Sequence, residues 1–197
     1  MSFERFFPLD LQLASERVLL RVLQPEDLEA FWSISGDPAL FTWFTRLLNE
    51  RDQLVLWMGE AFEQRRTHFR FPFTVIDKSS GRVAGSTSFG SISFPDQRIE
   101  IGWTWYGNDF RGTGLNTHCK FLLLQYAFET MGCQRVEIKT DALNARSRAA
   151  IKKLGMAEEG ILRSHTVMPG GRRRDTVYYG LLVAEWPAAK ERLLALV

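Results

Sequence analysis

The sequence predicts an α/β protein of the mixed α+β type, with a largely antiparallel sheet and one strand–helix–strand crossover. Strand-like segments rich in branched apolar residues follow one another through the first half of the chain. Strand and helix patterns then alternate from about residue 98. The length of 197 residues and a hydrophobic content of 45% fit a single domain, residues 1–197, with one sizeable core.

The first half begins with a strand over 16–23, followed by a helix over 25–35 that starts with a proline and acidic residues. A second helix is expected over 49–66, where apolar residues recur every three or four positions. Residues 71–77 and 82–92 predict a hairpin closed by a Ser-Ser-Gly turn, and 98–106 predict the next strand.

The second half begins with a glycine-rich loop over 107–113 and a long apolar helix over 114–131. A strand over 134–141 and a short helix over 144–154 follow. Two strands on either side of residues 168–175, and a last helix from Glu185, complete the predicted fold. The sequence has no internal repeat, low-complexity tract or linker.

Composition and charge exclude several classes of protein. Lysine plus arginine (25) against aspartate plus glutamate (23) gives a formal net charge of +2, too small to indicate a nucleic-acid-binding body. Cys119 and Cys133 lack CxxC spacing, which argues against a disulfide scaffold or a structural zinc site. Charges interrupt the N-terminus and no apolar run approaches ~20 residues, so we expect a cytoplasmic protein that neither spans nor binds a membrane.

The loop before the long helix has the features of an anion site. Gly112 and Gly114 allow main-chain N–H groups to approach a phosphate, the helix start adds the positive end of its dipole, and Arg111 adds a charge. The match to a dinucleotide-binding fingerprint is poor, because Thr117 stands in place of the third glycine and several strands precede the loop.

Three separated motifs occur in a characteristic order: RIEIGWTW, then RGTG at the helix start, then VEIKTDALNARSRAAIKKLGM. Together with the closing stretch GRRRDTVYYGLLVAEW, this combination resembles the GCN5-related N-acetyltransferase (GNAT) superfamily over about residues 10–190. Within it, the sequence is similar to the branch that includes the ribosomal-protein N-terminal acetyltransferases. The resemblance implies acetyl-coenzyme A (acetyl-CoA) as co-substrate, a cofactor-binding core at about 98–156, and two central strands that splay apart.

The resemblance also implies which residues bind the cofactor. The pyrophosphate would be held by Arg111, Gly112, Thr113, Gly114, Asn116 and Thr117. The pantetheine arm would pair with the strand backbone at Trp103, Thr104 and Trp105. Asn116 departs from the family pattern, where glycine or alanine is usual, so its side chain is either tolerated near the phosphate or hydrogen-bonds it.

Glu100 is the candidate general base. Its position in the strand, taken alone, favours an acid that faces solvent. The resemblance instead implies a base that acts directly or through water, because an attacking amine is largely protonated at neutral pH. The opposite face of the strand is expected to carry Ile99, Ile101, Trp103 and Trp105.

Ser147 is the candidate for assisting the leaving thiolate. It shares the inward face of the 144–154 helix with Ile151 and Leu154. Its hydroxyl either bonds back to a helix carbonyl or, as the resemblance implies, donates to the departing sulfur. Many relatives have a tyrosine for this role at the position aligned with Ile151. Asn144 either caps the helix or bonds the pantetheine.

The remaining candidates are weaker. Trp43 and Phe44 lie between the first two helices, a region that the resemblance places over the acceptor site, so they are candidates to line the acceptor pocket. His118 is expected to be a partly exposed neutral histidine, with a phosphate contact as the alternative. No spacing among the histidines indicates a metal. The arginines at 172–174 follow a turn and are either a solvated hairpin tip or an attraction for an acidic peptide.

The function that we infer from the sequence is an acetyl-CoA-dependent N-acetyltransferase that works by direct transfer, without a metal. The acceptor is a primary amine, either a protein N-terminus or a small molecule, and the sequence does not choose between them. The alternatives from other classes are a non-catalytic acyl-CoA-binding module and a nucleotide-binding oxidoreductase. A homodimer is left open.

Overall fold

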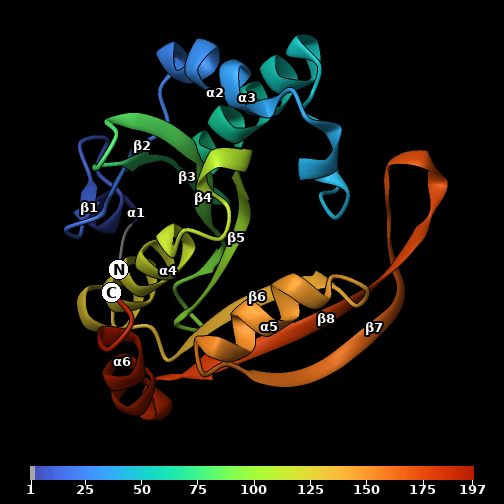
Figure 1. Ribbon diagram of the computed structural model, residues 1–197. Coiled ribbons are helices and arrows are strands. Elements are labelled where there is room, and N and C mark those ends of the chain that lie inside the picture. Colours follow the sequence, from blue (N-terminus) through green and yellow to red (C-terminus); the bar gives the residue numbers. More distant parts are fainter. Residues whose placement is uncertain (1–2) are drawn as a thin grey trace.

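An eight-stranded sheet organises the computed structural model, which describes residues 3–197 (Figure 1). The strand order is β1-β2-β3-β4-β5-β6-β8-β7, and every neighbouring pair is antiparallel except β5 and β6. The strands are β1 (Gln12–Ala14), β2 (Val18–Val22), β3 (Arg70–Asp77), β4 (Arg82–Ser93), β5 (Arg98–Tyr106), β6 (Arg135–Asp141), β7 (Ala157–Val167) and β8 (Arg173–Leu182).

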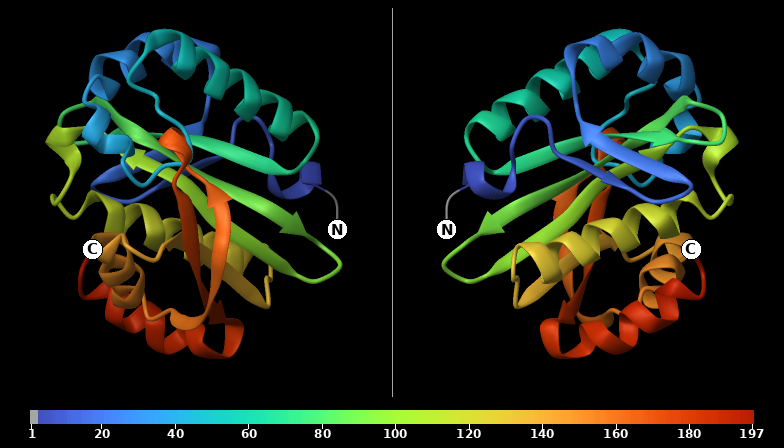
Figure 2. Two further views of the ribbon diagram at one scale, coloured as in Figure 1. Left: turned by 90° about the vertical axis from the view of Figure 1, so that its right-hand side faces the viewer. Right: turned by 90° about the vertical axis from the view of Figure 1, so that its left-hand side faces the viewer.

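Helices cover both faces of this sheet (Figure 2). They are α1 (Phe3–Phe6), α2 (Leu28–Ser35), α3 (Arg51–Arg66), α4 (Leu115–Gln125), α5 (Ala145–Lys153) and α6 (Trp186–Leu194). The α2 and α3 helices lie on one face, and α4 and α6 lie on the other. In the described part of the chain, no helix has the length and apolar character needed to cross a membrane.

The predicted elements are confirmed with small shifts of their ends, and the β5–α4–β6 unit is the expected crossover. The long helix is α-helical only to Gln125 and continues as a π-helical turn over Tyr126–Thr130. The sequence reading missed α1 and β1, since elements of four and three residues are too short to show a period.

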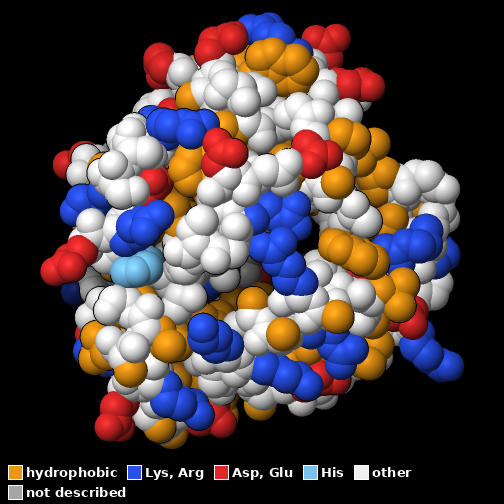
Figure 3. Space-filling view, in the orientation of Figure 1, with side chains coloured by type: hydrophobic (Ala, Val, Ile, Leu, Met, Phe, Trp, Pro, Cys, Tyr) orange, Lys and Arg blue, Asp and Glu red, His pale blue; other side chains and the backbone are white. Residues whose placement is uncertain are grey.

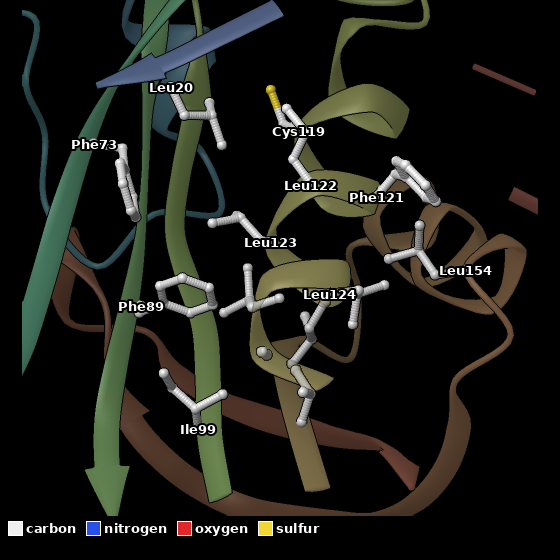
Figure 4. Close-up of a cluster of buried hydrophobic side chains, with 14 of the residues drawn as sticks. Leu20, Phe73, Phe89, Ile99, Cys119, Phe121, Leu122, Leu123, Leu124 and Leu154 are labelled. Atoms are coloured by element: carbon white, nitrogen blue, oxygen red, sulfur yellow. The ribbon is translucent and has the colours of Figure 1, made fainter. Parts of the chain in front are cut away.

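The larger apolar core lies between the sheet and α4 (Figure 4). Phe73 and Phe89 from the strands face Leu122 and Leu123 from the helix. Cys119 lies in this core, as expected, and burial raises the pKa of its thiol to about 12, so the thiol is protonated at neutral pH.

A smaller aromatic cluster lies on the opposite face, where α2 and α3 pack. The Trp105 ring is 5.3 Å from Phe31 and 5.5 Å from Phe41, measured between centroids. Such pairs each contribute about 0.5–1.5 kcal/mol beyond the burial of their area. This cluster holds α2 and α3 over the end of β5.

The expected alternation along β5 is wrong beyond Ile101. Ile99 and Ile101 pack in the core with α4, whereas Trp105 lies in the opposite cluster and Trp103 in neither. The pairing with β4 skips a residue here, and Trp103 has a φ of +50°. A bulge adds one residue to one strand and so reverses the faces of the residues after it.

Candidate active site

The two central strands splay apart, as the resemblance implied. Residues Arg98–Glu100 of β5 pair with Arg135–Glu137 of β6, and the two strands separate beyond that point (Figure 1). The edge of β5 that faces β6 therefore has no strand partner from Ile101 onward within residues 3–197. Its backbone groups are available to an extended ligand with amides of its own.

Glu100 lies where the strands begin to separate. Its side chain is only 5% exposed, so the reading of a solvent-facing acid is wrong. Oε2 accepts hydrogen bonds from Ser91 Oγ and Lys139 Nζ, both at 2.9 Å. Oε1 accepts none from any described residue. A Cβ at Gly102 would be 3.1 Å from Oε1, so the glycine leaves room beside the free oxygen.

The loop before α4 presents a row of free amides. Gly112 and Gly114 have φ values of +78° and +87°, which favour glycine, and a Cβ on either would meet only open space. The five consecutive N–H groups from Gly112 to Asn116 donate to no acceptor in the described chain. A helix start with unpaired amides attracts an anion, so this loop has the properties expected of a phosphate site.

Basic residues border this loop. Burial, and after it the positive charge of Arg146, lower the pKa of Arg111. Figure 3, which views the molecule as in Figure 1, shows Lys and Arg side chains gathered beside a hollow near the middle of the visible surface. Clustered positive charge of this kind is stabilised when an anion binds.

The polar side chains of the loop have local partners. The Asn116 Oδ1 accepts from the Tyr106 hydroxyl at 3.2 Å, which turns this side chain toward β5. Thr113 Oγ1 donates to the carbonyl of Phe110 at 2.9 Å, and Thr117 is half-buried. The main-chain amides, the Arg111 side chain and the positive end of α4 are the groups of this loop best suited to an anion.

Ser147 and Asn144 lie at the start of α5, which follows the end of β6. Asn144 Oδ1 accepts from the Ser147 N–H at 3.0 Å, so Asn144 caps the helix. The Ser147 hydroxyl is half-buried and has no hydrogen bond to any residue in 3–197, so the back-bonded alternative is not present. It remains free to donate to a ligand.

Two hollows lie beside the segment between α2 and α3, the region that the resemblance places over the acceptor site. The smaller one is lined by Phe44, Thr45, Arg46, Trp57, Glu60, Gln64, Arg70 and Trp103. The other, of about 310 Å³, shares Thr45 and Arg46 with it and extends to Pro169 at the β7–β8 turn. Trp43 lines neither hollow, and its ring packs 5.7 Å from the Arg172 guanidinium.

The arginines at the β7–β8 turn are less solvated than a free hairpin tip would be. Arg172 forms an ion pair with the buried Asp141 of β6, and Arg174 is buried, with Nε donating to Thr176 Oγ1 at 3.0 Å. Arg172 and Arg173 are exposed, as the solvated reading expects, and only Arg174 departs from it. The pairing of β8 with β6, which are far apart in the sequence, brings these arginines against β6. The run of three arginines in the sequence does not reveal this contact.

Histidine and metal chemistry are not evident at this site. His118 is half-buried with Nδ1 3.2 Å from Ser15 Oγ, and burial lowers its pKa, so it is neutral at neutral pH, as expected. Within residues 3–197, no group of three or more His, Cys, Asp or Glu could hold a metal ion.

The sequence reading missed several polar residues near the site, Ser91, Lys139, Arg70, Gln64 and Lys120. Lys120 carried a visible signal, a lysine inside the apolar stripe of the long helix. Its Nζ donates to Thr104 Oγ1 at 2.7 Å, and burial lowers its pKa to about 8. Ser91, Lys139 and Arg70 depend on the register of strands far apart in the sequence, and Gln64 depends on how α3 packs on the sheet; no local pattern reveals either.

The chain is similar to known acetyltransferases along most of its length. The model of the acetyltransferase (GNAT) domain family matches residues 17–157. The "Putative ribosomal N-acetyltransferase YdaF" of Bacillus subtilis (strain 168) is 34% identical over 110 residues, which cover 56% of this chain and 59% of that protein. The match therefore spans less than two thirds of YdaF.

Solved structures share the whole fold. A GCN5-related N-acetyltransferase from Brucella melitensis superposes with a TM-score of 0.88 at 31% identity, covering 96% of this chain and 87% of that one. Mycobacterium smegmatis RimJ, solved in complex with CoA-disulfide, superposes with a TM-score of 0.78 at 22% identity, covering 90% and 88%. With the splayed strands, the free loop amides and a family match over more than half of its residues, the chain belongs to the GNAT acetyltransferase family.

Proposed function

We propose that this acetyltransferase transfers the acetyl group of acetyl-CoA directly to the α-amine of a protein N-terminus. One observation carries the proposal: the opening between β5 and β6 has a buried carboxylate, Glu100, where the strands meet, and five free amides in the loop that follows β5. A buried carboxylate and a row of free amides on either side of an unpaired strand edge support this proposal, with the carboxylate as base and the amides as anion site.

The residues present fit the cofactor. The amides from Gly112 to Asn116 would hold the pyrophosphate, with Arg111 adding charge. The free edge of β5 at Trp103–Trp105 would pair with the amides of the pantetheine arm. The Asn144 amide group, whose oxygen caps α5, has an N–H₂ left for the same arm. When bound, acetyl-CoA supplies a thioester carbonyl open to attack.

The chain's own residues then manage one proton and two developing charges. Glu100 Oε1 takes the proton that the acceptor amine loses as its nitrogen bonds to the acetyl carbon, while Ser91 and Lys139 hold Oε2 in place. The N–H groups of β5 stabilise the developing oxyanion. The Ser147 hydroxyl donates a hydrogen bond to the sulfur and stabilises the thiolate as the carbon–sulfur bond breaks, and the thiolate then takes its proton from solvent.

Similarity to YdaF supports a protein N-terminus as the acceptor. The larger hollow, of about 310 Å³, reaches Pro169 at the β7–β8 turn and shares Thr45 and Arg46 with the smaller one beside Trp103, so it offers space for more than a lone amine. A small-molecule amine would use the same catalytic residues, so the choice of acceptor is a separate question from the reaction.

Thiol release from acetyl-CoA by the purified protein tests this proposal. The acceptors are short peptides with free N-termini, the same peptides with blocked N-termini, a polyamine and free amino acids. We expect release with the free peptides and none with the blocked ones. Release only with the small amines would move the acceptor to the small-molecule class. No release with any amine, together with a rise in melting temperature with NAD and none with acetyl-CoA, would contradict the proposal.

A further inference from the structure

Arg70, the first residue of β3, is a buried arginine without an acidic partner. Its exposed fraction is 1%, Nε donates to Ser88 Oγ at 2.8 Å, and Nη2 is buried without a hydrogen-bond partner in the described chain. The rings of Trp57 and Trp103 each lie 5.0 Å from its guanidinium carbon. A buried charge is costly unless it is paired, so this arrangement lacks the anion that would complete it.

The charges around Arg70 do not supply that anion. Glu60 is the acid that acts on it, but Glu60 is exposed and forms an ion pair with Arg46 at the mouth of the hollow. Glu100, two strands away, already forms an ion pair with Lys139 through Oε2. Burial lowers the pKa of Arg70 only to about 9, so the guanidinium keeps its charge at neutral pH.

Other side chains of the same hollow also lack partners. The Trp57 Nε1 is buried without an acceptor, and the Gln64 Oε1 is buried without a donor. Rotating the Gln64 side-chain amide by 180° exchanges the positions of Oε1 and the N–H₂ group, which have nearly the same shape, and so puts the N–H₂ group where Oε1 lies. Three donors around one hollow then lack an acceptor, and a guanidinium with neighbouring N–H groups is the complement of a carboxylate.

Strand register connects this hollow to the general base. Arg70 lies directly opposite Gly90, and Gly90 lies directly opposite Glu100, so the three residues form one row across β3, β4 and β5 with side chains on one face. Two strand spacings separate the Cα atoms of Arg70 and Glu100 by about 10 Å. A Cβ at Gly90 would lie 2.2 Å from the Trp103 ring, so this glycine makes room for the indole between them.

We propose that Arg70 binds a carboxylate of the acceptor substrate while the amine of the same molecule lies at Glu100. Preferred acceptors are therefore primary amines that also carry a carboxylate, with the Trp103 indole beneath the span between the two groups. An acidic side chain near a peptide N-terminus and the carboxyl group of a small amino compound share this chemistry. The inference rests on the proposed function and names the substrate class of that site.

Matched acceptor pairs test the inference. One arm compares C-terminally amidated peptides that differ only by Glu or Gln at the first or second position. The other compares free amino acids with their carboxamides. We expect kcat/KM to be at least tenfold higher for the carboxylate member of a pair, and the arm with the larger ratio identifies the source of the carboxylate. Equal kcat/KM values within every pair would overturn the proposal.

Two variants assign the effect to this site. Arg70→Met should remove the difference in KM between the carboxylate acceptors and their neutral partners. Trp57→Phe keeps an aromatic ring at this position but removes the Nε1 donor, and it should lose part of the preference even if Arg70→Met fails to fold. Arg66→Met removes an exposed arginine from the same region and should keep the wild-type preference. An undiminished preference in folded Arg70→Met and Trp57→Phe would also refute the assignment.

A binding measurement separates this inference from the proposed function. Glutarate, a dicarboxylate without an amine, should raise the melting temperature of the wild type, raise that of Trp57→Phe less, and leave that of Arg70→Met unchanged. If no amine is acetylated but glutarate gives this result, the proposed function fails and the carboxylate site stands. If amines are acetylated without a carboxylate preference and glutarate has no effect, the site fails and the function stands.

Discussion

Replacing Lys120 with methionine should stabilise the protein at neutral pH. Lys120 lies between α4 and the sheet, where its Nζ donates to Thr104 Oγ1 at 2.7 Å and has no carboxylate partner in the described chain. Burial lowers its pKa from an ordinary value of 10.5 to about 8. The folded state therefore opposes the charge that lysine carries at pH 7.

The size of the effect follows from that shift. A pKa lowered by roughly 2.5 units corresponds to about 3 kcal/mol of lost stability below pH 8, where lysine is charged in both states. Methionine of similar length removes this cost but loses a charged hydrogen bond, worth about 1.5–3 kcal/mol. Thr104 keeps the Thr87 hydroxyl as a partner at 2.8 Å. We expect a net gain of about 1 kcal/mol, or roughly 2–4 °C in Tm.

Urea unfolding at several pH values between 7 and 9.5 measures this directly. The unfolded lysine binds more protons than the folded one between pH 8 and 10.5, so wild-type stability should rise over this range relative to Lys120→Met. Comparing the two proteins cancels the titration of Cys119 and Tyr106, which both contain. Lys153→Met, at an exposed position, is the control and should show no such trend. A difference that stays constant with pH would refute the reasoning, as would a variant less stable than wild type by more than about 1 kcal/mol at pH 7.

Three other variants test the proposed site. Ser147→Ala should lower kcat about tenfold and leave Tm and the KM for acetyl-CoA nearly unchanged, and an unaltered kcat in steady-state assays would show that the Ser147 hydroxyl does not assist the leaving thiolate. Arg111→Glu should weaken acetyl-CoA binding at least tenfold by calorimetry while changing kcat at saturation much less, and an unchanged Kd would make Arg111 a surface residue only. Gly90→Ala places a Cβ 2.2 Å from the Trp103 ring, so it should cost about 1–3 kcal/mol in urea unfolding and raise KM for the acceptor; wild-type values for both would mean that the ring can move aside freely.

Local patterns in the sequence predicted the elements that are long and regular. The α3 helix has a clear three- and four-residue apolar spacing. Gly112 and Gly114 indicated the loop before α4. The resemblance added the splayed strands and the position of Glu100, because both follow from motif order.

The sequence could not reveal features that depend on pairing between distant strands. The bulge at Trp103 arises from the register of β4 and β5, and a period of two assumed across it puts Trp105 on the wrong face. The burial of Glu100 depends on Lys139 from β6, and that of Arg70 depends on Trp57 from α3. Arginine at the start of a strand gives no sign that two indoles will enclose it.

The rate of thiol release by Glu100→Gln, measured from pH 7 to pH 9.5 beside the wild type, tests the central claim most directly. Glutamine keeps the shape of the side chain but cannot take a proton from the amine at neutral pH. The account predicts a kcat lower by about 10² to 10⁴ at pH 7, with a smaller loss at high pH, where more of the amine is already neutral. Wild-type rates for the variant at every pH would show that Glu100 is not the base.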